Sequence, residues 1–440
     1  MEWALVVVLL GVNLLLWTLI GGLRLTSEHL TIRPVHETPG RWGPSSARWP
    51  GELSPSDVAV LIPAHNEEPV IAATIRSALR LVPPGNVHVV ADGCDDATVE
   101  IARANGVKVL ELNPNRGKAG GIEAAAEHFD IPDRFAVLLL VDADTELDEH
   151  YLERGLPLLE MPDVVAVAGY AIAGWHPWEL SLVGRFLVAY RTRLYAVMQW
   201  LKYGQTWRWT NVTSIVPGFA SLYRTSVLRK MDLNPPGLVI EDFNMTFEVH
   251  HRRLGKIAFR PAVHATTQDP DNFRDYYRQV LRWHLGFWQT LRRHGFWFSG
   301  FSAALALFLI EVVAASLGLV LLAAALALLT PFVLVNYVAQ SLGWDIDLGG
   351  VVDAYTVLVL VLLFALAIDY LLTCLTALAF RRPELLLYGL GFLAVRFVDA
   401  TAALWTIPQA WRTQSDGRWI SPKRRRSTGS PQPTARGQPS

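Results

Sequence analysis

Aspartates that follow two predicted strands are the residues best placed to do chemistry in this chain of 440 residues. Asp92 follows the apolar run 87–91, and the triplet Asp142, Ala143, Asp144 follows the run 136–141. Ligands of a doubly wound sheet bind beyond the carboxyl ends of its strands, so we expect both groups in one crevice. There they can hold Mg²⁺ or Mn²⁺ together with the phosphates of a ligand. D-x-D alone is common in solvated turns, but the strand LLLV directly before it favours a metal and phosphate site.

A second acidic pair, Glu241 and Asp242, lies in the segment GLVIEDFNMTF. A carboxylate here can remove the proton from a hydroxyl group as that group attacks a substrate. Acidic pairs are also common at the first turn of a helix, where they complement the helix dipole. From the residues alone, both interpretations stay open.

Gln279, Arg282 and Trp283 form a Q-x-x-R-W pattern, whose spacing places them on one face of a helix. Arg282 can bind a pyrophosphate group, and Trp283 can stack on a sugar ring. The surrounding segment 273–298 interleaves aromatic with basic residues, which is typical of a helix lying in a membrane interface. A solvated basic helix is the alternative.

Two other nucleotide-binding motifs are excluded by their spacing. GKAGG at 117–121 lacks a phosphate-loop signature, because Leu112 stands where the first glycine is needed and Ala119 replaces the Ser or Thr. No G-x-G-x-x-G follows the first strand, which reads LIPAHNEE, so hydride transfer with a dinucleotide is not expected.

The elements that must position these residues alternate between strands and helices, which predicts an α/β fold with a mostly parallel sheet. The expected strands are 58–62, 87–91, 107–110 and 136–141, and the expected helices are 68–81, 97–105 and 118–129.

Four apolar segments, 3–20, 301–330, 351–380 and 385–411, are each long enough to cross a bilayer. Arginines flank the central domain, and the connection around Asp345, Asp347 and Asp353 is acidic, so the domain is expected in the cytoplasm. The basic tail around 423–426 conflicts with a third C-terminal crossing, and one segment is expected to be re-entrant or a hairpin. Glu311 and Asp369 lie within apolar segments, where ionisable groups tend to face a bundle interior or a wet cavity. Helix packing is the alternative role.

Composition adds exclusions. Basic and acidic residues number 39 and 40, which gives no footprint for nucleic acid. Two cysteines, Cys94 and Cys374, are too few for a disulfide framework.

Seven motifs occur in order: IPAHNEE, VVADGCDDAT, NRGKAGG, VDADT, VPGFASLYR, IEDFNMTFE and QVLRW. Together they resemble the processive family-two glycosyltransferases, which include cellulose, chitin and hyaluronan synthases. The closing DGRWISPKRR is most similar to bacterial poly-β-1,6-N-acetylglucosamine synthases. Cys94 and Ile240 depart from the family's usual Ser and Thr, and every charged role stays filled.

The resemblance implies a GT-A (Rossmann-like) fold and inverting transfer from a UDP-sugar. Asp92 would contact uridine, Asp142 the donor, Asp144 the Mg²⁺ or Mn²⁺, and Asp242 would be the base beside Glu241. Gln279, Arg282 and Trp283 would lie at the acceptor and pyrophosphate end. Lys118 is expected at the nucleotide, with an exposed lysine in a turn as the alternative, and Trp419 is expected to gate the site.

The expected organisation is an anchor (1–22), a linker (23–56), the GT-A domain (57–272), interfacial helices with Q-x-x-R-W (273–300), C-terminal spans (301–411) and a basic cytosolic tail (412–440). The expected function is to extend an extracellular β-linked polysaccharide from UDP-N-acetylglucosamine and to export it across the plasma membrane. A single-addition glycolipid enzyme and a β-glucan synthase using UDP-glucose are the alternatives. A small accessory membrane subunit is a further expected partner.

Overall fold

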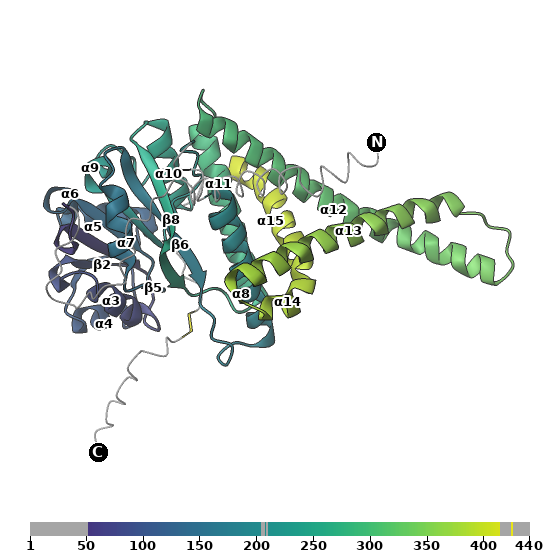
Figure 1. Ribbon diagram of the computed structural model, residues 1–440, viewed down its shortest axis with the longest axis horizontal. Coiled ribbons are helices and arrows are strands. Elements are labelled where there is room, and N and C mark those ends of the chain that lie inside the picture. Colours follow the sequence, from purple (N-terminus) through teal and green to yellow (C-terminus); the bar gives the residue numbers. More distant parts are fainter. Residues whose placement is uncertain (1–51, 204–206, 208–209, 414–423, 426–440) are drawn as a thin grey trace, which may run out of the picture.

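The computed structural model describes residues 52–203, 207, 210–413 and 424–425. An α/β domain occupies one end of the molecule, and long apolar helices extend from it (Figure 1). The expected anchor at 1–22, nearly all of the 23–56 linker and Trp419 lie outside the described residues.

An eight-stranded sheet forms the α/β domain, in the order β3-β2-β1-β4-β7-β6-β8-β5. Its strands are β1 (Val58–Ala64), β2 (Val87–Asp92), β3 (Lys108–Leu112), β4 (Val137–Val141), β5 (Thr145–Leu147), β6 (Val164–Ala173), β7 (Ala220–Arg224) and β8 (Lys256–Thr267). The first four coincide with the predicted strands. Both β1 and β4 are buried along their whole length, because helices cover both faces of the sheet.

The sheet is mixed and mostly parallel, as expected, because four of its seven strand pairs, β6–β8 among them, are parallel. Strands β1 to β4 pair in parallel, but β7 runs antiparallel to β4 and β6, and β5 to β8. Strand β6 ends and β7 begins at the same edge of the sheet, so the connection between these antiparallel strands does not cross to the opposite edge. This edge also holds the carboxyl ends of β1, β2, β4 and β8, where the motifs are expected to meet.

The helices of the α/β domain are α3 (Ile71–Leu79), α4 (Thr98–Ala104), α5 (Gly117–His128), α6 (Ile131–Arg134), α7 (Tyr151–Leu159), α9 (Thr225–Leu228) and α10 (Glu241–His251). The first three match the predicted helices. Helices α3 and α4 pack together, α5 packs with α6, and α7 lies against β6 and β8.

Helix α8 (Leu182–Tyr195), continued by a π-helical turn (Ala196–Tyr203), was not anticipated. It leaves the carboxyl end of β6 and packs with α11 (Phe273–His294), α14 (Glu384–Tyr388) and α15 (Phe392–Arg412). Their shared core is apolar: Leu187, Tyr190, Tyr276, Phe392, Val395 and Ala402. Helix α8 therefore connects the α/β domain to the C-terminal helices.

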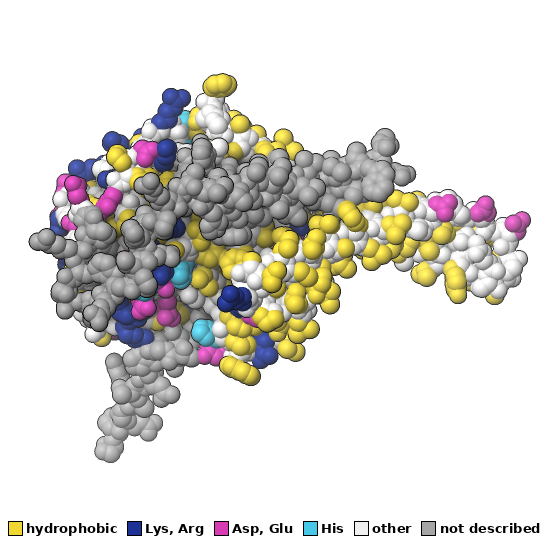
Figure 2. Space-filling model, viewed as in Figure 1, with side chains coloured by type: hydrophobic (Ala, Val, Ile, Leu, Met, Phe, Trp, Pro, Cys, Tyr) yellow, Lys and Arg dark blue, Asp and Glu magenta, His cyan; other side chains and the backbone are white. Residues whose placement is uncertain are grey.

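Among the described residues, three helical segments are long and apolar enough to cross a membrane: α12 (Gly300–Ser341), α13 (Gly349–Phe380) and Glu384–Arg412. They coincide with the expected C-terminal spans. At 1.5 Å per residue α12 is about 63 Å long, roughly twice the thickness of a hydrocarbon core. Helices α12 and α13 form a hairpin that points away from the α/β domain (Figure 1). Apolar side chains cover the hairpin and acidic ones gather at its tip (Figure 2).

Asp369 on α13 faces the interior of the helix bundle, as expected. Its Oδ2 lies 2.6 Å from Nη1 of Arg193 on α8, and its Oδ1 lies 2.9 Å from Nη1 of Arg396 on α15. Asp369 and Arg193 are buried whereas Arg396 is partly exposed, and the ion pairs join three helices, which supports the packing role for Asp369. Glu311 on α12 is partly buried.

The expected interfacial helices of 273–300 form one helix, α11, followed by a short link to α12. Helix α11 packs along α15: Tyr276 donates a hydrogen bond to Asp399 (2.6 Å), and Trp288 donates one to the backbone of Ala403 (3.2 Å). Both helices run in the same direction, because these contacts advance together along the chain. Where α11 lies relative to a membrane stays a prediction.

Candidate active site

Asp92, the last residue of β2, is fully buried at the carboxyl edge of the sheet. Its Oδ1 accepts a hydrogen bond from the backbone N–H of Arg116 (2.7 Å), and among the described residues its Oδ2 has no hydrogen-bond partner. Burial raises the pKa of Asp92, while the neighbouring backbone N–H groups oppose that shift. Gly93 turns the chain with a φ of +66°, and a Cβ there would lie 2.9 Å from Asn115. The site thus holds an acceptor atom ready for an N–H donor.

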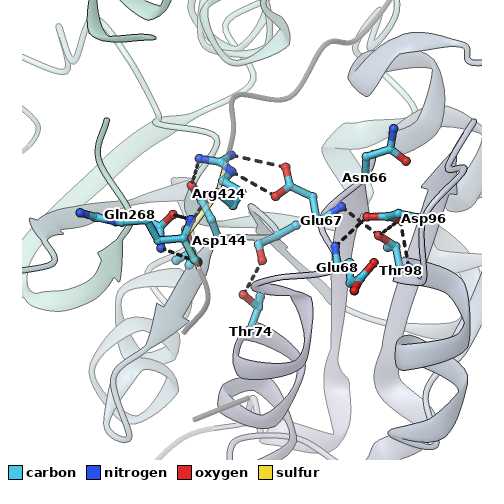
Figure 3. Close-up of polar contacts among 12 residues, drawn as sticks. Asn66, Glu67, Glu68, Thr74, Asp96, Thr98, Asp144, Gln268 and Arg424 are labelled. Atoms are coloured by element: carbon cyan, nitrogen blue, oxygen red, sulfur yellow. Dashed lines mark hydrogen bonds and ion pairs between the residues drawn. The ribbon is translucent and has the colours of Figure 1, made fainter. Parts of the chain in front are cut away.

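The loop after β1 and the loop after β2 hold each other by side chain to backbone hydrogen bonds. The backbone N–H of Glu67 donates to Thr98 (2.8 Å), and that of Glu68 donates to Asp96 (3.0 Å). In return, the backbone N–H of Asp95 donates to Asn66 (2.9 Å). Figure 3 shows this network beside Glu67. The two loops therefore form one fixed wall of the site.

The D-x-D turn after β4 is held from two sides. Thr74 on α3 donates a hydrogen bond to the carbonyl of Ala143 (2.7 Å), and the backbone N–H of Asp142 donates to the carbonyl of Phe219 (2.9 Å). Asp144 is nearly buried, and burial raises its pKa, which Arg424 opposes. The predicted aspartates, Asp92 from β2 and Asp142 and Asp144 from β4, all lie at the same edge of the sheet.

Lys118 joins the D-x-D turn to the second acidic pair. Its Nζ lies 2.6 Å from Oδ1 of Asp142 and 2.6 Å from Oε1 of Glu241. Burial alone would lower the pKa of Lys118, but the carboxylates of Asp142, Glu241 and Asp242 together raise it. Lys118 lies in the first turn of α5 and is largely buried, so the alternative of an exposed lysine in a turn is wrong.

Asp242 lies in the first turn of α10 next to Glu241, as the dipole argument allows, yet its surroundings are unusual for an acidic residue at a helix start. Burial and the adjacent Glu241 charge raise its pKa to about 7, and Lys118 opposes this shift. The backbone N–H of Gly218 donates to its Oδ2 (3.3 Å). A carboxylate whose pKa is near neutrality can both accept and release a proton under ordinary conditions.

Gly218, in the motif VPGFA, lies directly against this cluster. A Cβ at this position would lie 3.0 Å from Nζ of Lys118 and 3.1 Å from Oε1 of Glu241. The missing side chain therefore leaves the room that Lys118 needs to contact both carboxylates.

Residues of the C-terminal tail reach the site. Nη1 of Arg424 lies 2.5 Å from Oδ2 of Asp144, and its Nε lies 3.0 Å from Oε2 of Glu67 (Figure 3). The backbone of Arg425 exchanges two hydrogen bonds with the side chain of Gln268, which follows β8. The predicted gate, Trp419, lies outside the described residues, so its role stays a prediction.

The Q-x-x-R-W residues do not meet the aspartates directly. Gln279 accepts a hydrogen bond from Nη2 of Arg191 (2.7 Å), and the Arg191 guanidinium lies 4.3 Å from the ring centroid of Trp283. The ring of Tyr276 lies 4.7 Å from the same guanidinium, which is therefore held between two aromatic rings. Gln279 and Trp283 thus hold a buried arginine of α8, whereas the roles of all three motif residues toward substrate stay predictions.

Arg191 connects this helix to the aspartate edge. Its Nε lies 3.7 Å from Oδ1 of Asp269, which also accepts a hydrogen bond from Tyr195 (2.8 Å). Asp269 directly follows Gln268, the residue that holds the tail. No sequence signal marked Arg191, because α8 carries no motif. Glu67 and Arg424 belong to two of the sequence motifs, IPAHNEE and DGRWISPKRR. Their contact joins residues 357 positions apart, so the motifs did not predict it.

A divalent metal at this site would need oxygen ligands from the aspartates. Among the described residues, no group of three or more His, Cys, Asp or Glu side chains is arranged to hold a metal ion. Mg²⁺ sites that act on phosphates use one or two carboxylates and take their other ligands from substrate and water. Asp142 and Asp144 fit such a site, and each already has a cationic side chain at 2.5 or 2.6 Å.

An open cavity of about 910 Å³ adjoins the site. Asp144, Thr74 and Gln268 line it where it meets the aspartates, and the rest runs along β5 and β8 past His264. Asp92, Lys118 and Asp242 are not part of its lining, so the cavity neighbours the catalytic cluster but does not contain it.

A strand order of this kind, with carboxylates at one edge joined by a buried lysine, defines a GT-A glycosyltransferase domain. The family model "Glycosyltransferase like family 2" matches residues 55–286, more than half of the chain. The chain belongs to this family of glycosyltransferases.

Curated relatives match part of the chain. Over 251 residues it is 30% identical to the probable glycosyltransferase YdaM of Bacillus subtilis, covering 52% of this chain and 54% of that protein. Over 108 residues it is 34% identical to the dolichyl-phosphate hexose transferase of Haloferax volcanii, covering 24% and 45%. The chain thus spans about half the length of the curated relatives it matches.

One solved structure with a distant likeness is the mannosyltransferase PcManGT from Pyrobaculum calidifontis in complex with GDP-Man and Mn²⁺. It is 18% identical, with a TM-score of 0.49, and the match covers 82% of this chain and 97% of that chain.

Proposed function

We propose that this glycosyltransferase extends a β-linked polysaccharide by inverting transfer of a sugar, N-acetylglucosamine, from its UDP derivative. The observation that carries the chemistry is the double contact of Lys118 with Asp142 and Glu241. It joins the D-x-D turn, which suits a diphosphate, to the acidic pair that suits a proton acceptor. Donor and acceptor chemistry therefore meet within one cluster.

The donor end follows from the aspartates. The unpartnered Oδ2 of Asp92 can accept the N–H of a uracil ring. Asp142 and Asp144 would hold Mg²⁺ or Mn²⁺, which neutralises charge on the departing diphosphate. Lys118 supplies a further positive charge at the same turn, and Arg282 is the expected pyrophosphate contact at the far end.

The acceptor end uses Asp242. Its carboxylate takes the proton of the acceptor hydroxyl, the hydroxyl oxygen bonds to the anomeric carbon, and the bond from that carbon to the diphosphate breaks. Nucleoside diphosphate leaves, and the proton stays on Asp242 until solvent removes it. A pKa of about 7 suits both proton uptake and release.

The tail contact supports a membrane topology that differs from a simple count of spans. Arg424 contacts Asp144, so the tail and the catalytic edge share one side of the membrane. The chain must then cross an even number of times between α11 and the tail. We propose that α12 and α13 cross, whereas Glu384–Arg412 lies beside α11 at the cytoplasmic face. This arrangement also keeps the basic residues at 381–382 and 423–426 on the cytoplasmic side.

A single addition to a lipid-linked acceptor is the second candidate. The name of the Haloferax relative, a dolichyl-phosphate hexose transferase, favours it, as do helices suited to a lipid surface. A β-glucan synthase that uses UDP-glucose would have the same carboxylates. Processivity is supported by the Q-x-x-R-W residues, which hold Arg191 next to the aspartate edge.

Product analysis separates these candidates. Membranes containing the chain are incubated with labelled UDP-N-acetylglucosamine or UDP-glucose and Mg²⁺, and the product is sized and digested with hydrolases specific for each linkage. We expect a polymer of N-acetylglucosamine that a β-1,6-specific hydrolase degrades. A product that extracts into organic solvent with one sugar would establish the single-addition reaction instead.

A further inference from the structure

The guanidinium of Arg424 is fully engaged by carboxylates of the donor site. Its Nη1 lies 2.5 Å from Asp144, while its Nε and Nη2 lie 3.0 Å and 3.4 Å from the two oxygens of Glu67. The Arg424 side chain is 13% exposed and Glu67 is completely buried. This two-pronged contact is the geometry in which arginine binds a carboxylate most specifically.

The receptor for this arginine is built from fixed groups. Glu67 is held by Thr98, the D-x-D turn is held by Thr74, and the backbone of Arg425 is paired on both its N–H and its carbonyl with Gln268. Each of these contacts joins a different segment of the catalytic edge, as Figure 3 shows. Arg424 and Arg425 are therefore docked at a defined position.

The docked position conflicts with a metal ion. Asp144 is the proposed ligand of the divalent cation, and Arg424 already places a positive charge on its Oδ2. A divalent cation on the same carboxylate would lie within a few ångströms of the guanidinium, in a poorly hydrated site where like charges repel strongly. Each cation therefore weakens the binding of the other to this carboxylate.

We propose that Arg424 and the divalent cation compete for Asp144, so that the docked tail opposes metal binding until a nucleotide diphosphate supplies further ligands. The proposal rests on the metal-binding role assigned to Asp144 above. A tethered arginine competes at high effective concentration, whereas a free ion must be supplied by the solution. Because coupling between two binding events is reciprocal, a bound metal weakens tail docking by the same factor. Metal and nucleotide then load together, and the tail leaves Asp144 when they do.

The experiment measures Mn²⁺ binding by the full chain in lipid nanodiscs, from the electron paramagnetic resonance signal of free Mn²⁺, with and without UDP. For Arg424→Gln without UDP, we expect Mn²⁺ affinity to rise on the order of tenfold, within the usual range of coupling between two sites. With UDP present, the gain should shrink. Arg425→Gln is the matched control, because its side chain faces Asp271 and not Asp144, and its Mn²⁺ affinity should equal that of the wild type.

The double variant Glu67→Gln, Arg424→Gln guards against a folding defect, since it removes the buried charge of Glu67 together with its cation. It should bind Mn²⁺ at least as tightly as Arg424→Gln. Unchanged or weaker Mn²⁺ binding by both variants without UDP overturns the competition. Loss of UDP binding in Arg424→Gln would make this arginine a donor ligand and overturn it as well.

Asp144→Asn separates the competition from the proposed function. If it binds Mn²⁺ with UDP as well as the wild type does, Asp144 is not a metal ligand and the assigned role fails. If it loses Mn²⁺ while Arg424→Gln behaves as the wild type, the role of Asp144 holds and only the competition fails.

Discussion

Nζ of Lys118 lies 2.6 Å from Oε1 of Glu241, the residue directly before the proposed base Asp242. The lysine comes from α5 and the glutamate from α10, so folding creates this pair from distant segments. Because Lys118 also contacts Asp142, a change of charge at any of these positions is felt at both ends of the reaction.

Replacing the proposed base should strongly reduce turnover and leave nucleotide binding at the donor site intact. In Asp242→Asn the acceptor hydroxyl keeps its proton, and we expect the rate of sugar transfer to fall roughly 10²–10⁴-fold. UDP binding, measured by calorimetry on the purified chain, should stay close to that of the wild type. Near wild-type turnover would show that another group removes the proton.

Lys118→Met should change the pH dependence of the reaction. Asp242 acts only when ionised, so with a pKa of about 7 the wild-type kcat/KM should fall about tenfold per pH unit below that value. Lys118 lowers the pKa of Asp242, so its removal should move the midpoint of the profile to higher pH, along with a loss of rate. The midpoints of the wild-type and Lys118→Met kcat/KM profiles, measured between about pH 5.5 and pH 9, are compared. An unchanged midpoint would mean that Asp242 does not set the profile.

Arg191→Gln should impair the acceptor end and spare the donor end. It removes a cation held between Tyr276 and Trp283, a contact type worth roughly 0.5–2 kcal/mol, and it leaves Gln279 without its charged partner. We expect a roughly tenfold loss of polymer elongation with unchanged UDP affinity. Arg191→Lys should recover part of the loss. An equal loss of UDP binding would indicate a general structural role.

Trp419→Ala tests the proposed gate in the tail. If Trp419 closes over the reacting sugar and excludes water, the variant should turn over more slowly and hydrolyse more donor. It should stay with the membrane fraction, because the apolar helices are unchanged. A purely electrostatic tail, held by its basic residues at a lipid surface, would tolerate the change.

The topology can be tested with a single cysteine at position 427. In a background with Cys94 and Cys374 replaced by serine, Ser427→Cys should resist an impermeant thiol reagent in intact cells and react after the cells are opened. A cysteine at Asp347, in the tip between α12 and α13, is the matched control and should react from outside. Ready labelling of position 427 in intact cells would exclude a tail on the catalytic side.

Local patterns predicted the first half of the fold well. Strands β1, β2 and β4 are continuous apolar runs because the sheet is covered on both faces, and their ends therefore located Asp92, Asp142 and Asp144 correctly. The second half was harder to predict. Strand β7 runs antiparallel between β4 and β6, and the excursion through α8 has no turn or motif that reveals its destination.

The contacts within the site could not be predicted from local patterns, because they form between segments that are distant in the sequence. The spacing of Gln279 and Trp283 predicted a common helix face, but only the structure shows that this face holds Arg191. Similarly, Arg424 belongs to a basic run that lipid headgroups would attract equally well. Its contact with Glu67 joins residues 357 positions apart in the chain, and no local pattern encodes that contact.

If the chain exports a sugar polymer as proposed, the hairpin of α12 and α13 limits the path that the polymer can take. Two helices touch along a single line and cannot surround anything, whereas a hydrated chain of sugars needs a closed ring of protein to shield it from lipid tails. Within the described residues, α12 and α13 are the segments assigned here to the bilayer, and both expose apolar side chains over most of their length. The rest of that wall must come from elsewhere: the apolar run at 3–20, a second copy of the chain, or a different membrane protein.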